Sequence, residues 1–161
     1  MTKNKILLLA LAAAAALALL LWATAVKGWP HARPVFAHAK LTVTRQDSKV
    51  FSYDVEVAQS LRQQIYGLMY VRKLPSDAGM IFPYDPPREV AFWMENTYIP
   101  LDMLFVKPDG TIGRIVTNAK PFDLAPIDSQ INVSAVIEIN AGDVARHGFT
   151  VGDRVASSAL P

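Results

Sequence analysis

The chain has 161 residues, of which 52% are hydrophobic, and it contains no cysteine. This length predicts one globular domain. The lack of cysteine excludes a disulfide scaffold, a thiolate zinc site and a thiol nucleophile. Without residues 1–25, the chain has 14 basic and 14 acidic side chains and is formally neutral. Because nucleic-acid binding needs a basic surface that holds phosphates, we expect no nucleic-acid partner.

The N-terminal segment predicts export. A short basic stretch precedes an uncharged, apolar run over residues 6–26, and residues 23–25 form an Ala-Thr-Ala cleavage pattern. This combination predicts a signal peptide over residues 1–25. The apolar run is also nearly long enough to span a bilayer, so an uncleaved anchor over residues 6–26 remains the alternative. In both cases we expect a periplasmic or extracellular domain that meets the membrane only through an uncleaved N-terminal segment.

The remaining chain divides into three parts. Residues 26–39 contain Pro30 and Pro34 and show little periodicity, which predicts an extended linker. Residues 40–157 are expected to form a single globular β domain, and residues 158–161 a short tail.

Most of the predicted elements are short strands. Alternation of apolar and polar residues predicts strands over residues 41–44 and 50–57. Ser60 as N-cap and Gly67 as terminator predict a short helix between them. Further strands are predicted over residues 80–82, 90–94, 101–106, 111–117 and 135–139. A second helix is predicted over residues 141–147, and a turn followed by an edge strand over residues 151–155. This pattern favours a mainly β fold, either a β-sandwich or a distorted barrel with two short helices.

Two proline-containing segments predict turns. Pro108-Asp109-Gly110 has the composition of a hairpin turn, because Pro fixes φ while Asp and Gly supply the turn geometry. Asp85-Pro86-Pro87 is expected to turn the chain after the strand at residues 80–82.

Four segments together resemble a known family, the domain of unknown function 192. They are Gly-Leu-Met at residues 67–69, Gly-Met-Ile-Phe at 79–82, the block from Phe-Trp-Met to Leu-Phe at 92–105, and Val-Ile-Glu-Ile-Asn-Ala-Gly at 136–142. The resemblance covers about residues 43–155. It implies a small, sandwich-like, often exported domain, and it implies no particular reaction.

The longest of these segments contains a candidate polar site. Asp102 interrupts an apolar strand, so its carboxylate must face solvent, pair with a base or accept backbone N–H groups. One interpretation is that Asp102 and Asn96 hold the turn at residues 97–100. The other is that Asn96, Thr97, Asp102 and Arg72 line a binding pocket.

Trp93 is the aromatic candidate for contact with a ligand. It lies between Phe92 and Met94, so both faces of the predicted strand are apolar, which favours deep burial. The sequence leaves open whether this block is core or recognition surface.

A catalytic reading is the alternative to binding. Asp102 and Glu138 could form an acid–base pair acting on a small or carbohydrate-like envelope substrate if they converge. A Glu between Ile137 and Ile139 is also ordinary at an outward-facing position of a half-exposed strand, and we favour this interpretation of Glu138. Neither a nucleophile elbow nor a glycine-rich phosphate loop is present, so we expect a non-enzymatic role.

Methionine offers a weaker metal hypothesis. Met69, Met80, Met94 and Met103 could supply thioether ligands for Cu(I) in a protein without cysteine. Methionine is also common filler in irregular cores, and we expect no cofactor or metal. The sequence therefore predicts an exported module that binds a ligand or an envelope protein, with a purely structural domain as a further alternative.

Overall fold

The computed structural model describes residues 32–161, and the predicted signal peptide or anchor lies outside this range. The domain forms a compact unit over Pro34–Pro161. No helix in residues 32–161 combines the length and the hydropathy needed to cross a membrane.

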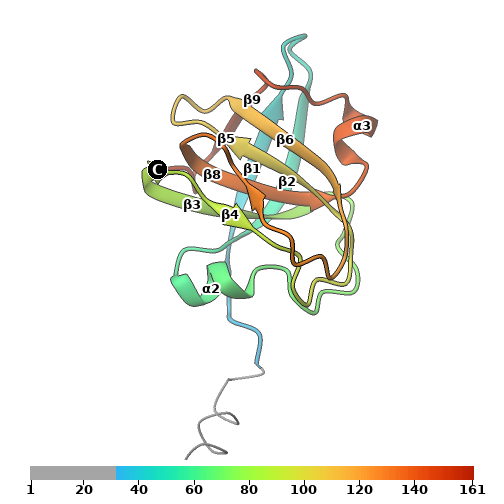
Figure 1. The fold of residues 1–161 in the computed structure, drawn as a ribbon. Coiled ribbons are helices and arrows are strands. Elements are labelled where there is room, and N and C mark those ends of the chain that lie inside the picture. The colour runs from blue at the N-terminus through green and yellow to red at the C-terminus, as the bar shows by residue number, and fades with distance from the viewer. Residues whose placement is uncertain (1–31) are drawn as a thin grey trace, which may run out of the picture. The chain divides into compact units, whose positions relative to one another are not determined.

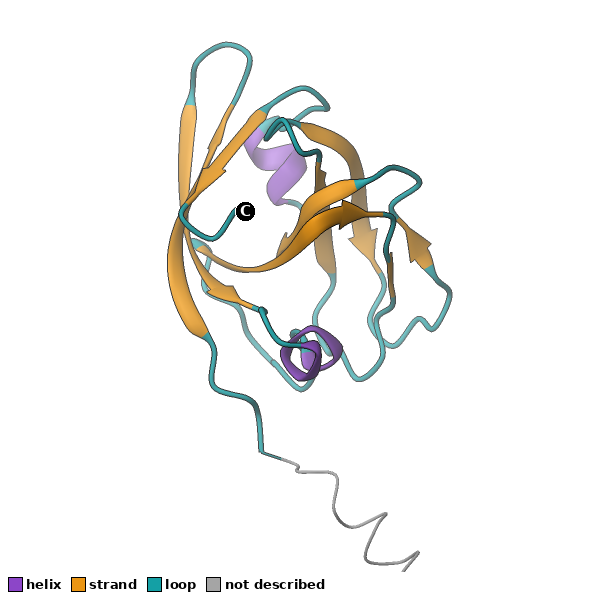
Figure 2. Ribbon diagram, turned by 90° about the vertical axis from the view of Figure 1, so that its left-hand side faces the viewer, coloured by secondary structure: helices purple, strands orange, loops and turns teal. Residues whose placement is uncertain are grey.

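The domain is mainly β, as predicted, with two short helices in the described residues. Its elements, in chain order, are β1 (Ala37–Thr44), β2 (Val50–Val57), α2 (Leu61–Tyr66), β3 (Ala78–Arg88), β4 (Ala91–Phe92), β5 (Leu101–Val106), β6 (Ile112–Ala119), β7 (Ile127–Asp128), β8 (Val133–Asn140), α3 (Asp143–His147) and β9 (Arg154–Ser157). The two helices lie at opposite ends of the fold (Figures 1 and 2).

Seven strands form a sheet that closes into a distorted barrel. Their order is β6-β5-β8-β3-β2-β1-β9, and β4 pairs separately with β7. Thr111, directly before the first strand in this order, forms an antiparallel bridge with Arg154 of the last strand. The Val155 amide donates to the Gly110 carbonyl at 2.8 Å, and the Ile112 amide donates to the Asp153 carbonyl at 2.8 Å. The predicted terminal strand, β9, therefore closes the barrel.

The central strands bury both of their faces. One core fills the barrel with side chains such as Leu104, Ile137 and Ile81. A second core lies on the outer face of the sheet, beneath α2 and the β4–β7 pair. It includes Met80 of β3, Phe105 of β5 and Val136 of β8. All six residues of β5 are buried, which explains its nearly continuous apolar sequence.

The helix α2 begins as its sequence predicts. The Ser60 hydroxyl accepts from the Gln63 amide at 3.3 Å, while the Gln63 side chain accepts from the Ser60 amide at 2.8 Å. This reciprocal pair is a capping box. The apolar residues Leu61 and Ile65 do not enter the core, because their side chains are 72% and 44% exposed.

We expect Ser60→Ala to lower the free energy of unfolding by about 1 kcal/mol, because it removes one half of the capping box. Urea denaturation of the variant beside the native protein measures this change. Ser52→Ala, at an exposed position of β2, is the control and should change stability by less than about 0.5 kcal/mol. Equal stabilities of Ser60→Ala and the native protein would contradict the role of the cap.

Three local predictions differ from the structure. The predicted turn at residues 85–87 is wrong, because β3 continues to Arg88 with a register shift against β8 after Pro83. The predicted strand over residues 90–94 is reduced to β4. β1 begins at Ala37, so residues 37–39, which the sequence predicts to be linker, belong to this strand. The first two differences involve pairing with strands that are distant in sequence, which local patterns do not reveal. The third extends the pairing of β1 with the next strand, β2.

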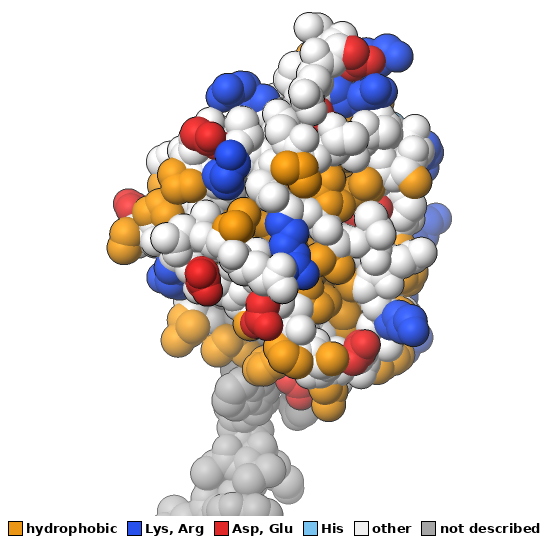
Figure 3. All heavy atoms as spheres, turned by 45° about the horizontal axis from the view of Figure 1, so that its top comes forward, with side chains coloured by type: hydrophobic (Ala, Val, Ile, Leu, Met, Phe, Trp, Pro, Cys, Tyr) orange, Lys and Arg blue, Asp and Glu red, His pale blue; other side chains and the backbone are white. Residues whose placement is uncertain are grey.

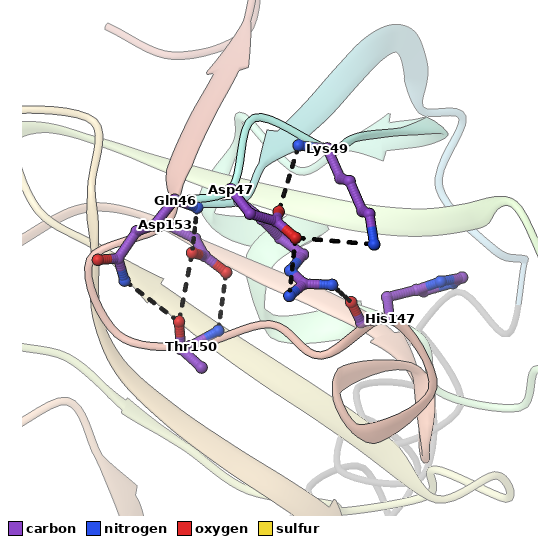
Figure 4. Close-up of polar contacts among 7 residues, drawn as sticks. Gln46, Asp47, Lys49, His147, Thr150 and Asp153 are labelled. Atoms are coloured by element: carbon purple, nitrogen blue, oxygen red, sulfur yellow. Dashed lines mark hydrogen bonds and ion pairs between the residues drawn. The ribbon is translucent and has the colours of Figure 1, made fainter.

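Polar contacts join the β1–β2 turn to the segment between α3 and β9 (Figure 4). Asp153 is 1% exposed, and its carboxylate accepts from the amides of Gln46 at 3.1 Å and Thr150 at 2.8 Å. Arg45 donates to the His147 carbonyl at 3.1 Å. These bonds fix the end of the barrel that carries α3.

Candidate ligand-binding site

A cavity of about 370 Å³ lies on the outer face of the sheet. Its walls are residues 64–69, from α2 and the turn that follows it, and residues 89–93, around β4. Phe82 and Tyr84 of β3 and Glu138 of β8 also line the cavity, as do Arg88, Glu95 and Thr97. All four segments that carry the family resemblance therefore contribute at least one residue to the same cavity.

Glu138 supplies a buried carboxylate to this cavity. Its side chain projects from β8 between Met80 of β3 and Met103 of β5, which are its partners in register. The residue is 5% exposed. Gly79 allows β3 to approach β8 here, since a Cβ atom at this position would lie 2.6 Å from the Glu138 carbonyl oxygen. Two close strands thus hold Glu138 in a fixed position.

The Glu138 carboxylate has no hydrogen-bond or ion-pair partner among residues 32–161. Burial raises its pKa to about 8, because loss of water disfavours the charged form. A buried carboxyl group with a strongly raised pKa in a cleft is typical of functional sites.

Aromatic rings form much of the wall around this carboxyl group. The rings of Phe82 and Phe92 meet edge to face with centroids 5.0 Å apart. The Arg88 guanidinium lies 4.7 Å from the centroid of the Tyr84 ring. Burial raises the pKa of the Tyr84 hydroxyl, the Arg88 charge acts in the opposite direction, and Glu138 adds to the increase. Tyr84 therefore remains a neutral donor at ordinary pH.

Asp102 lies on the other face of the sheet from Glu138. In the β5–β8 register Asp102 is opposite Ile139, whereas Glu138 is opposite Met103. Adjacent residues of a strand point to opposite faces, so Asp102 faces the barrel interior and Glu138 faces the cavity. The structure does not bring the predicted acid–base pair together.

The Asp102 carboxylate is instead occupied by backbone amides. It is fully buried and accepts from Asn118 at 2.9 Å, Gly142 at 2.9 Å and Val144 at 3.0 Å. These bonds hold an irregularity in β6 and the first turn of α3, which has no side-chain cap of its own. Asp102 therefore has a structural role. Its carboxylate holds β6 and α3, and not the turn at residues 97–100 that the sequence suggested.

The other predicted ligand-binding residues are divided between the cavity and its surroundings. Thr97 and Trp93 line the cavity. Trp93 is 53% exposed, so the predicted deep burial of this side chain is wrong. Asn96 lies outside the lining, where its amide contacts the Met69 sulfur at 4.0 Å. Arg72 stacks 4.8 Å from the centre of the Tyr98 ring and does not reach the cavity.

The four methionines have separate environments. Met80, Met94 and Met103 are buried in the outer core, at most 1% exposed. Met69 alone of the four lines the cavity. In the described residues no group of three or more His, Asp or Glu side chains has the geometry of a metal site.

Sequence reasoning missed several residues of the wall. Tyr84 continues the alternation of Met80 and Phe82 along β3, and extending this pattern through Pro83 would have found it. Arg88, Glu89 and Tyr66 come from segments that have no local signal for a site.

Comparison with known proteins agrees with this fold. The family described as uncharacterised ACR, DUF192, matches residues 41–157. The chain belongs to this family. No protein of curated function matches it significantly.

Crystal structures that are similar to the chain include the following two. One, from Sinorhizobium meliloti 1021, is described as a candidate transcription regulator; it has 40% sequence identity and a TM-score of 0.77, and the match covers 80% of this chain and 100% of that one. The other is a protein of unknown function from Novosphingobium aromaticivorans DSM 12444, with 36% identity and a TM-score of 0.72 over 78% of this chain and 94% of that one.

Proposed function

We propose that the protein is an exported, non-enzymatic binding module of the cell envelope whose ligand occupies the cavity over Glu138. The observation that carries this proposal is the convergence of four family-like segments on one cavity with a buried carboxyl group that has no partner among the described residues. Ligand sites are typically concave, mainly apolar and provided with a few fixed polar groups. A volume of about 370 Å³ is suitable for a small molecule.

The charge distribution supports a small ligand over a nucleic acid. Beyond residues 1–25 the chain has equal numbers of basic and acidic side chains. On the face drawn in Figure 3, blue and red side chains are interspersed and form no broad patch of one sign. A nucleic-acid surface requires clustered positive charge. The description of the structure from Sinorhizobium meliloti therefore does not lead us to propose a regulatory role in transcription.

Mass spectrometry under non-denaturing conditions tests the proposal on protein purified gently from the envelope of an exporting host. We expect an intact mass that begins at Val26, together with the mass of a retained small molecule. Trp93→Ala should lower the retained fraction severalfold, because it removes an aromatic wall of the cavity. Phe122→Ala is the matched control, since Phe122 is also exposed but does not line the cavity. A bare mass for the native protein would contradict the proposal.

A further inference from the structure

The Glu138 carboxyl group indicates what the ligand must supply. It is 5% exposed, it lines the cavity, and within the described range it makes no hydrogen bond or ion pair. A buried carboxylate is stable only when it is paired or fully hydrogen-bonded. Since residues 32–161 supply no partner, a ligand group with positive charge and N–H donors would complete this site.

The remaining charged groups around the cavity do not replace that partner. Arg88 stacks on Tyr84 of the same strand. Glu89, after β3, and Glu95, after β4, also line the cavity, so its lining has three carboxyl groups and one guanidinium. Tyr66 of α2 and Tyr84 of β3 contribute hydroxyl groups. The lining is therefore richer in acidic than in basic groups.

The aromatic walls suit the same kind of ligand. The rings of Phe82 and Phe92, together with Trp93, Tyr66 and Tyr84, surround the cavity. The faces of aromatic rings carry partial negative charge and attract cations, most strongly when water is excluded. They also provide the apolar contact area that a ligand body needs.

We propose that the cavity binds a small organic cation, with its ammonium group paired with the Glu138 carboxylate and its apolar body held between the aromatic walls. This inference rests on the proposed binding function and specifies its ligand class.

Binding of a cation must be coupled to release of a proton. With a pKa of about 8, the Glu138 carboxyl group is mostly protonated at pH 7 when the cavity is empty. Pairing with an ammonium group requires the carboxylate, so the carboxyl proton passes to solvent and no other bond changes. Affinity should therefore rise about tenfold per pH unit up to about pH 8 and then level off.

Isothermal titration calorimetry with three matched probes tests this inference. The probes are 2-phenylethylamine, which is a cation below about pH 9, the neutral 2-phenylethanol and the anionic 3-phenylpropionate. We expect the amine to bind at least about tenfold more tightly than either of the others at pH 8. Titrations in buffers of different ionisation enthalpy should show release of nearly one proton at pH 7.

Variants separate the role of Glu138 from general effects of charge. Glu138→Gln should weaken amine binding about 30-fold or more at pH 8 and abolish its pH dependence. Asp77→Asn removes one exposed carboxyl group that does not line the cavity. This variant should change neither the affinity for the amine nor the pH dependence of that affinity. Circular dichroism shows whether both variants are folded.

Three results would overturn the cation proposal: equal or tighter binding of the alcohol or the acid, amine binding that is unchanged in Glu138→Gln, or no binding of any probe. The first would leave the cavity as a binding site of another ligand class, and the second would show that the amine binds without pairing with Glu138. After the third, a small molecule retained in the mass spectrum of envelope protein would still support the binding function. The two proposals thus fail separately.

Discussion

Replacing Glu138 with glutamine is expected to leave the free energy of unfolding nearly unchanged at pH 4 and to raise it by up to about 5 kcal/mol at pH 9. Burial raises the pKa of this carboxyl group from 4.5 to about 8 in the folded protein. Between these values the folded state keeps a proton that the unfolded state has released. Stability of the native protein therefore falls as pH rises through this interval, and glutamine, which does not titrate, removes that loss.

Urea denaturation of the ligand-free protein at intervals between pH 4 and pH 9 measures this difference. Asp77→Asn is the control, because Asp77 is exposed and the native pH dependence should be retained. If plots of the free energy of unfolding against pH were parallel for the native protein and Glu138→Gln, the pKa of Glu138 would not be raised by folding. This result would contradict the expectation from its burial.

The second large effect is expected at Asp102. Asp102→Ala should destabilise the domain by about 4 kcal/mol, because it leaves three buried backbone amides without an acceptor. Those amides belong to Asn118, Gly142 and Val144, which lie 16, 40 and 42 residues away along the chain. Losing the carboxylate therefore loosens β6 and α3 together.

Chemical denaturation measures the loss of stability, and amide hydrogen exchange locates it. The three amides should exchange much faster in Asp102→Ala than in the native protein. Asp128→Ala, at an exposed position of β7, is the control and should stay within about 0.5 kcal/mol of the native stability. Unchanged protection of the three amides would exclude the proposed role of Asp102.

The accuracy of the sequence predictions depends on how local their causes are. β2, the helix after Ser60 and the turn at Pro108-Asp109-Gly110 depend on neighbouring residues, and all three are observed. The parallel pairing of β2 with β3 and the closure between Thr111 and Arg154 join distant parts of the chain. No periodic pattern in either segment specifies its partner.

The candidate site also combines features that are local in sequence with features that depend on distant strand pairing. Glu138 stands out in sequence because it interrupts an apolar strand, and Trp93 stands out as a large aromatic residue in a family-like block. Which face of the sheet each carboxylate occupies depends on the register of β5 against β8. A shift of one residue reverses the faces, so the separation of Asp102 from Glu138 required the assembled barrel.

The cavity draws its floor and its walls from different parts of the fold. Glu138 and Phe82 belong to inner strands of the barrel, whereas residues 64–69 and 89–93 lie outside it in short elements and loops. Loops tolerate substitution better than a closed sheet does. The domain is therefore suited to protein engineering as a scaffold: libraries that vary the walls would present new shapes above one unchanged carboxyl group, while the barrel that folds the protein stays intact.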